Sequence, residues 1–73
     1  MATVTVTSGG KPVKGAEVKA VCTFGFNQYD QQCMTDVSGK AKLADNVNRF
    51  RILVNGREAD LVDRLQGNIE VEV

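Results

Sequence analysis

The 73-residue chain carries nine Lys and Arg against nine Asp and Glu, so its formal net charge is zero, and it contains no His. A neutral chain lacks the basic character of a nucleic-acid-binding protein, and no apolar run approaches the ~20 residues that a membrane-spanning helix needs. The length predicts a single domain over residues 1–73. A core of this size supplies only about 3–5 kcal/mol, so a disulfide, a partner or a parent chain would add needed stability.

The first residues show no secretory signal, because Met1 leads directly into an alternating segment without a charged or an apolar leader region. Two interpretations stay open: a cytosolic protein, or a mature domain taken from a longer chain. The residues alone favour neither.

A period of two runs through the first third of the chain. Residues 2–7 alternate Ala or Val with Thr, and residues 16–24 place five small or apolar side chains on one parity. Successive side chains of a strand point to opposite faces, so both segments predict strands with one buried face. The glycines and the proline of residues 8–12 predict the turn between them.

Shorter strands and turns follow. Residues 25–31 read as the connection of a hairpin whose second strand covers residues 32–35. Residues 36–39 predict a tight turn, in which Asp36 bonds its own downstream backbone and Gly39 takes the left-handed conformation. Residues 40–44 alternate again, with apolar residues at two inward positions.

The last third predicts a hairpin and a final strand. Residues 49–54 form a strand that ends at Asn-Gly, the strongest short hairpin signal. The chain then returns over residues 57–62 as a strand, although residues 58–66 also fit a helix through leucines four apart. Residues 69–73 alternate Ile or Val with Glu and predict the closing strand.

Six or seven short strands with regular turn signals predict an all-β fold, an antiparallel β-sandwich or a small barrel. No helix of sufficient length fits between the strands, which excludes parallel strand–helix–strand units. The predicted core comprises the inward residues of these strands: Val4, Val6, Val18, Ala20, Cys22, Leu43, Phe50, Ile52, Val54, Ile69, Val71 and Val73.

Two segments resemble motifs of carboxypeptidase regulatory-like domains. Residues 10–18 resemble their G-x-P-v-x-G-A-x-V stretch, and residues 35–43 resemble their T-D-x-x-G-x-a-x-L stretch. The resemblance implies a prealbumin-like Greek-key sandwich of seven strands, usually a non-catalytic module of bacterial surface or secreted proteins. It therefore favours a secreted or cell-surface location. One departure is Arg57, which stands where the family commonly has an aromatic residue after the glycine turn.

The two cysteines are a candidate disulfide. If the hairpin is symmetric about residues 27 and 28, Cys22 lies directly opposite Cys33, near disulfide reach. Such a bridge would contribute roughly 3 kcal/mol. The alternative is that Cys22 is a small buried residue and Cys33 an unbridged neighbour.

Aromatic residues gather in the loop over residues 25–31, which makes Phe26, Asn27 and Tyr29 the candidate contacts for a ligand or partner. Binding residues are often placed on loops held by rigid strands. The alternative is that these rings fold over one end of the sandwich.

Catalytic and metal-binding patterns are absent from the sequence. A cysteine nucleophile normally needs a His base, and two cysteines without His do not make a metal site. The alternating cations of residues 40–42 and 49–51 are interpreted as protection of sheet edges; the alternative is a basic stripe along neighbouring strands.

The sequence therefore predicts no enzyme, no cofactor and no metal. It favours a structural or protein-interaction module whose partner is an unknown protein or a parent chain. The alternative is a carbohydrate-binding module that uses the aromatic loop over residues 25–31.

Overall fold

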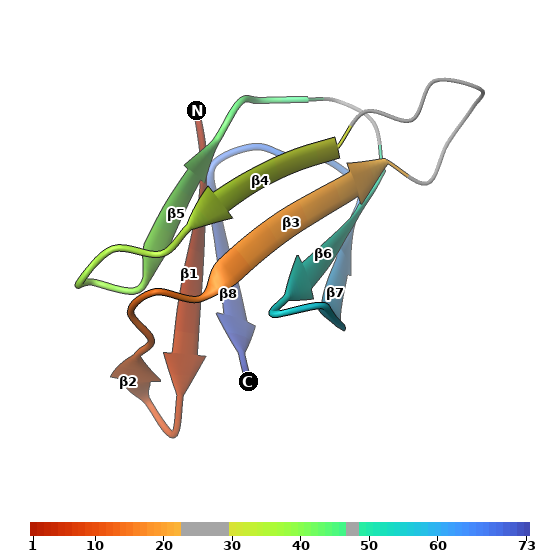
Figure 1. Ribbon diagram of the computed structural model, residues 1–73. Coiled ribbons are helices and arrows are strands. Elements are labelled where there is room, and N and C mark those ends of the chain that lie inside the picture. Colours follow the sequence, from red (N-terminus) through yellow and green to blue (C-terminus); the bar gives the residue numbers. More distant parts are fainter. Residues whose placement is uncertain (23–29, 47–48) are drawn as a thin grey trace.

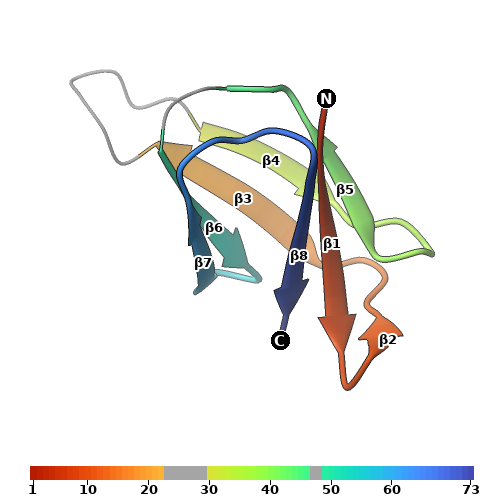
Figure 2. The same ribbon diagram turned by 180° about the vertical axis from the view of Figure 1, so that it is seen from behind.

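The computed structural model describes residues 1–22, 30–46 and 49–73, which form eight strands and no helix. The strands build two layers that face each other (Figures 1 and 2). In chain order they are β1 (Ala2–Ser8), β2 (Lys11–Pro12), β3 (Glu17–Cys22), β4 (Asp30–Met34), β5 (Lys40–Leu43), β6 (Phe50–Val54), β7 (Arg57–Val62) and β8 (Asn68–Glu72). This confirms the predicted all-β sandwich and shows a strand, not a helix, over residues 57–62.

The first sheet is organised around β1. One edge of β1 pairs with β5 and, at its end, with the short β2, both antiparallel. The other edge pairs with β8 in parallel, from Thr3 beside Asn68 to Thr7 beside Glu72. This pair departs from the predicted antiparallel pattern. It is possible because β8 is reached from the opposite sheet by a crossing segment and not by a hairpin, which would force opposite directions.

The second sheet has the order β4-β3-β6-β7 and is antiparallel throughout. The turn between β6 and β7 has positive φ at both central residues, 53° at Asn55 and 84° at Gly56. That combination is the one a two-residue type I′ hairpin requires, and it confirms the turn predicted from Asn-Gly. One irregularity interrupts the β6–β7 register, between Ile52 and Leu53.

The core lies between the inward faces of the two sheets. Phe50 and Ile52 from the second sheet and Val4 and Val6 from the first are completely buried. All the predicted core residues are buried except Val73, which is 55% exposed. Val73 directly follows the end of β8 at Glu72.

One large core residue was not predicted. Leu65 is completely buried although it lies outside the eight strands, on the segment that crosses from β7 to β8. Its main-chain N–H and C=O both bond to Asn46, at 2.8 and 2.9 Å. The crossing segment is therefore fixed by both its side chain and its backbone.

Thr35 anchors the passage from β4 in the second sheet to β5 in the first. Its buried hydroxyl donates to the carbonyl of Val13 at 2.6 Å and accepts from the N–H of Ala16 at 2.8 Å. The main-chain N–H of Thr35 also donates to the carbonyl of Ala16 at 2.9 Å. Thr35 therefore provides hydrogen-bond partners for the main-chain groups that precede β3, and it aligns the end of β4 with the start of β3.

Gly39 ends this passage in contact with β1. Its φ is 75°, and the N–H of Val6 donates to its carbonyl at 2.7 Å. A Cβ added to Gly39 would lie 2.6 Å from the carbonyl oxygen of Val6. Both the left-handed backbone and the close approach therefore require glycine here, which confirms the predicted role of Gly39.

Replacing Ile52 with Ala tests the placement of the core. Because Ile52 is completely buried, we expect the free energy of unfolding to fall by about 2–5 kcal/mol, measured by urea denaturation. Leu61→Ala is the control, since Leu61 is 53% exposed and its loss should change stability by no more than about 0.5 kcal/mol. A loss below about 1 kcal/mol for Ile52→Ala would contradict the assigned register.

Gly39→Ala separates the steric contact from the backbone strain. Gly67 has a similar φ, 67°, but open space around its Cβ position. Gly67→Ala should therefore lower the free energy of unfolding only by the left-handed strain of about 1–2 kcal/mol. Gly39→Ala should cost clearly more, because the new methyl group also meets the Val6 carbonyl. Equal losses in urea denaturation would show that the contact is easily relieved.

Candidate functional site

The two sides of the sandwich differ, and the side formed by β4 and β5 is closed. The Gln31 side chain on β4 donates to the carbonyl of Ala44 at 2.9 Å and accepts from its N–H at 2.7 Å. At the other end of β5, the N–H of Asp36 donates to the carbonyl of Lys40 at 3.0 Å. The main chain of Ala44 is thus occupied by Gln31 of the neighbouring sheet, and that of Lys40 by Asp36 of the segment between β4 and β5.

The opposite side, formed by β7 and β8, is open. Among the described strands, β8 pairs only with β1 and β7 pairs only with β6. Thr3 donates to the carbonyl of Gly67, and Val73 donates to that of Thr7, both at 2.8 Å. Strand residues alternate in direction, so the odd-numbered residues of β8 turn their main-chain groups toward β1. The main-chain groups of the even-numbered residues, Glu70 and Glu72 among them, face the free edge.

β7 extends beyond the cover of the first sheet. Five of its six residues are exposed, and only Val62 is half-buried. A strand inside a sandwich normally buries one face against the opposite sheet. Here the first sheet ends at β8, so the face of β7 that would lie inside a wider sandwich meets solvent instead.

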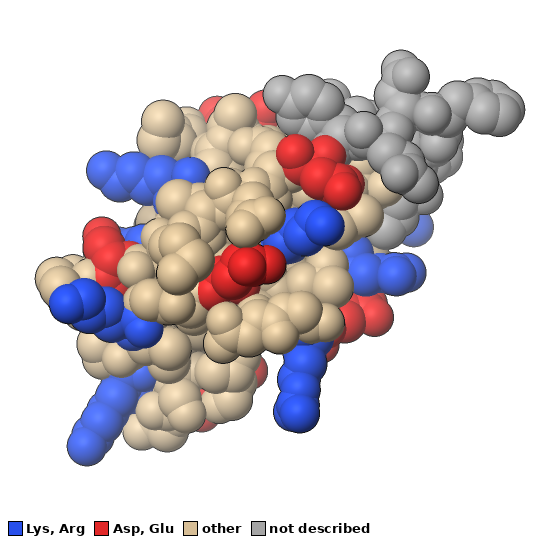
Figure 3. All heavy atoms as spheres, in the orientation of Figure 1, with Lys and Arg blue, Asp and Glu red and all other residues tan. Residues whose placement is uncertain are grey.

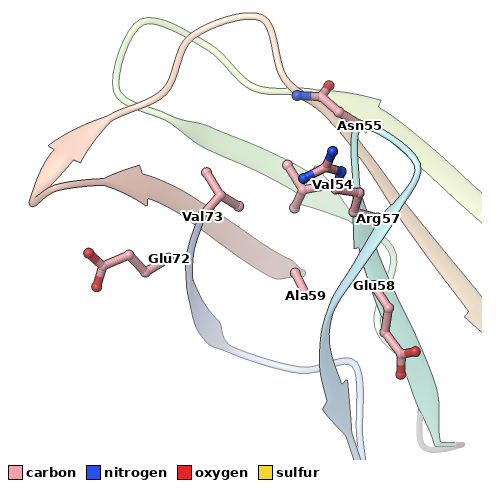
Figure 4. Close-up of a pocket in the computed structure, with 7 residues that line it drawn as sticks. All are labelled: Val54, Asn55, Arg57, Glu58, Ala59, Glu72 and Val73. Carbon is pink, nitrogen blue, oxygen red and sulfur yellow. The ribbon is translucent and has the colours of Figure 1, made fainter.

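A groove of about 510 Å³ lies on this open side (Figure 4). Val54, Ala59 and Val73 surround the same space and provide its apolar surface, while the carboxylates of Glu58 and Glu72 are directed outward. Asn55 and Arg57 complete the lining. The volume falls within the usual range for binding pockets, and the lining combines aliphatic floor and charged rim.

Charge separates along the chain toward this side. Residues 57–73 contain five Asp and Glu and two Arg, whereas residues 1–56 contain seven Lys and Arg and four Asp and Glu. Both signs are interspersed on the face shown in Figure 3. Residues 57–73, which include β7 and β8, therefore carry a formal charge of −3, and residues 1–56 carry +3.

Three glutamates lie on the two strands of the open side, and Glu58 on β7 differs from Glu70 and Glu72 on β8 because it forms an ion pair. Glu58 lies 3.3 Å from the Nε of Arg51 on β6. Both partners are exposed, so the pair contributes little to stability. Neither Glu70 nor Glu72 forms an ion pair in the described part of the chain, and both are exposed on β8, where they alternate with the buried Ile69 and Val71.

The predicted contact residues Phe26, Asn27 and Tyr29 lie outside the described residues. The carbohydrate-binding alternative, which depends on them, therefore stays a prediction. The alternative of a basic stripe along neighbouring strands finds no support, because β5 and β6 belong to different sheets.

The predicted opposition of the two cysteines is wrong. Cys33 lies opposite Val18, and Cys22 pairs with Phe50 on the other neighbour of β3. Four positions along β3 separate Val18 from Cys22, about 13 Å of strand, which is far beyond disulfide reach. The two cysteines are not joined in this structure. The register follows from the bonds between Thr35 and Ala16, not from a symmetric loop.

Sequence reasoning missed the open side and its groove, although one signal pointed to it. Residues 57–62 have no parity that is consistently apolar, since charged residues occupy both. The lack of an apolar face is typical of a strand that no opposite sheet covers. The predicted outward position of Glu70 and Glu72 is confirmed.

Other kinds of site find no support in the part of the chain that the structure describes. It contains no group of three or more His, Cys, Asp or Glu side chains placed to hold a metal ion. It also contains no helix that is long and apolar enough to cross a membrane.

Comparison with protein-family models, with curated proteins and with solved structures gives no significant match to the chain. The likeness to carboxypeptidase regulatory-like domains, which was drawn from the turn motifs, therefore stays a prediction. The open side of the sandwich must be interpreted from its own geometry.

Asp36 makes the stability of the turn between β4 and β5 depend on pH. Its carboxylate accepts from the N–H groups of Ser38 and Lys40, at 2.8 and 3.1 Å. These backbone bonds, first that of Lys40 and then that of Ser38, hold the pKa of Asp36 below its ordinary value. The stabilisation is therefore complete above the ordinary aspartate pKa of about 3.9 and is lost as the pH falls through the lower folded-state pKa.

Asp36→Asn tests this dependence. Asparagine keeps an oxygen that accepts both N–H groups but does not titrate, so we expect its urea midpoint to fall less than that of the wild type when the pH is lowered from 5 to about 2.5. Asp30→Asn is the control, because the Asp30 carboxylate forms only a long, exposed ion pair of 3.8 Å with Lys19. Identical acid profiles for the wild type and Asp36→Asn would contradict the assignment.

Proposed function

We propose that the chain is a non-catalytic module that binds another protein through the open side of its sandwich. The observation that carries this proposal is that β7 and β8, two strands that each have a free edge, flank the same groove. The described side chains there are aliphatic groups and exposed charges. Such a surface suits binding, in which apolar area and main-chain groups are covered together.

The contrast with the closed side supports the proposal. At the two ends of β5 the chain uses Gln31 and Asp36 to occupy the outward main-chain groups of Ala44 and Lys40. No described side chain does the same for β8. Because exposed strand edges promote unwanted association, proteins usually cover or twist them. The edge of β8, which has no such cap, supports the interpretation of the open side as a surface kept for a partner.

The resemblance to carboxypeptidase regulatory-like domains fits this proposal. Modules of that family are usually non-catalytic, and the two-layer sandwich seen here is the architecture that the resemblance implies. We therefore include a prealbumin-like origin in the proposal. Its support is the Thr-Asp-x-x-Gly turn at residues 35–39, in which Thr35, Asp36 and Gly39 each make a specific contact.

Site-specific photo-crosslinking tests the proposed surface. Ala59 is replaced by p-benzoylphenylalanine, which places the reactive group at the groove, and the variant is irradiated in cells that naturally make the protein. Ala59 is exposed, so the fold should tolerate the change. We expect a discrete crosslinked product with another protein.

The same probe at Lys42 is the matched control, because Lys42 is also exposed but lies on β5 at the closed side. It should not give that product. A product of the same size from both positions, or none from the groove, would overturn the proposal. Circular dichroism of both variants confirms that the sandwich is intact.

A further inference from the structure

We propose that the open side binds an extended segment of a partner protein as an additional strand beside β8, and that this segment alternates apolar residues with Lys or Arg. The inference rests on the proposed function and specifies the mode and chemistry of binding. Three features of the described residues carry it: the main-chain groups of β8, the alternation of its side chains, and the uncovered face of β7.

The main chain of β8 offers a template for pairing. The ladder to β1 uses Gly67, Ile69, Val71 and Val73, as the bonds at its two ends show. The N–H and C=O groups of Asn68, Glu70 and Glu72 therefore point to the free edge, and no bond of the described residues reaches them. Addition of a strand satisfies such groups with main-chain hydrogen bonds, which supply affinity without depending on sequence.

The side chains of β8 define the sequence of that strand. Neighbouring strands place directly opposed side chains on the same face of the sheet, about 4.5–5.5 Å apart. On the outer face, Glu70 and Glu72 are both exposed. Opposite charges at opposed positions stabilise a sheet and like charges destabilise it, so the added strand should carry Lys or Arg on this face.

The inner face of the added strand would meet the groove. Its apolar residues would lie beside Ile69 and Val71 and above the surface formed by Val54, Ala59 and Val73. They would also extend the first sheet to a position opposite β7, whose face is now exposed. Alternation of apolar and basic residues is therefore required by the two faces together.

A second copy of this chain does not meet these requirements. Pairing β8 with another β8 would bring glutamates of the two outer faces together, which is unfavourable. Two segments of the described chain have the required pattern: β5 reads Lys-Ala-Lys-Leu, and residues 49–52, which lead into β6, read Arg-Phe-Arg-Ile. Both edges of β6 are already paired, with β3 and with β7. The edge of β5 is occupied, however, by Asp36 at Lys40 and by Gln31 at Ala44. The occupant is therefore a segment from another protein.

The probe is a synthetic nine-residue peptide that alternates lysine and valine, with blocked ends. Its binding to the full chain is measured by isothermal titration, and amide hydrogen exchange is followed by NMR. We expect saturable binding that weakens with added salt. The amides of Glu70 and Glu72 should exchange at least tenfold more slowly when the peptide is bound, because they gain main-chain partners.

A sorted peptide with the same composition, lysines first and valines last, is the control for charge alone. It should bind at least tenfold more weakly and should leave the exchange of both amides unchanged. Equal binding of the two peptides would reduce the interaction to nonspecific attraction and would overturn the proposal.

Two variants of β8 separate the main-chain and the side-chain contributions. Glu70→Pro removes an N–H that faces the free edge without removing a bond to β1, which proline at a sheet edge permits; it should abolish binding and keep the far-UV spectrum. Glu70→Gln combined with Glu72→Gln should weaken binding about threefold to tenfold. Lys40→Gln combined with Lys42→Gln, at the closed side, should not weaken it.

Two outcomes would overturn the proposal in different ways. Sedimentation of the chain alone that shows self-association, abolished by Glu70→Pro, would identify a second copy as the occupant. Crosslinking from position 59 without any binding of the alternating peptide would leave the protein-binding function standing and reject strand addition. Failure of both experiments would reject the function as well.

Discussion

The passage from β4 to β5 is the constraint on which the rest of the sandwich depends. Thr35 lies at its start and Gly39 at its end, and both contacts join elements that are distant in sequence. The hydroxyl of Thr35 is buried with both of its bonds made, so its removal would leave the N–H of Ala16 and the carbonyl of Val13 unpaired. The same residue aligns β4 with β3, while Gly39 sets how closely β5 approaches β1. Together the two residues fix the ends of the segment by which the chain passes from the second sheet to the first.

This anchoring of one side explains why the other side is open. The passage holds β4 and β5 together, and the amide of Gln31 and the backbone of Asp36 occupy the edge of β5. On the far side, the chain crosses from β7 to β8 through a segment fixed by the buried Leu65. After that crossing β8 runs parallel to β1, and β7 lies one strand beyond the edge of the first sheet. The groove is therefore a consequence of topology, since four strands face a sheet that is only three strands wide.

Most of the fold could be predicted from the period of two and the turn residues. Residues 2–7 and 69–73 bury one face only, so their alternation states both the strand and its inward side. The register of β3 and β4 could not be obtained in this way. A shift by one residue would exchange the two faces, but the shift by four that separates prediction from structure leaves every side chain on the same face. The alternation of side chains therefore cannot distinguish these two registers, and the buried hydroxyl of Thr35 decides between them instead. Leu65 was missed for a related reason, because an irregular segment has no period to reveal an inward residue.

The candidate site was harder to predict than the core because it is a surface of β7 and β8 that no other strand covers. The outward direction of Glu70 and Glu72 followed from sequence, yet the same pattern describes any solvated face. What makes these residues distinctive is that their main-chain groups also face outward, and this depends on which neighbour β8 pairs with. Sequence patterns show that a strand has a buried face but not which of its edges is free. The glutamates have two effects once the edge is known: they oppose pairing of β8 with a second β8, and they favour a basic strand. The same charges that protect this edge from self-association would thus select its partner.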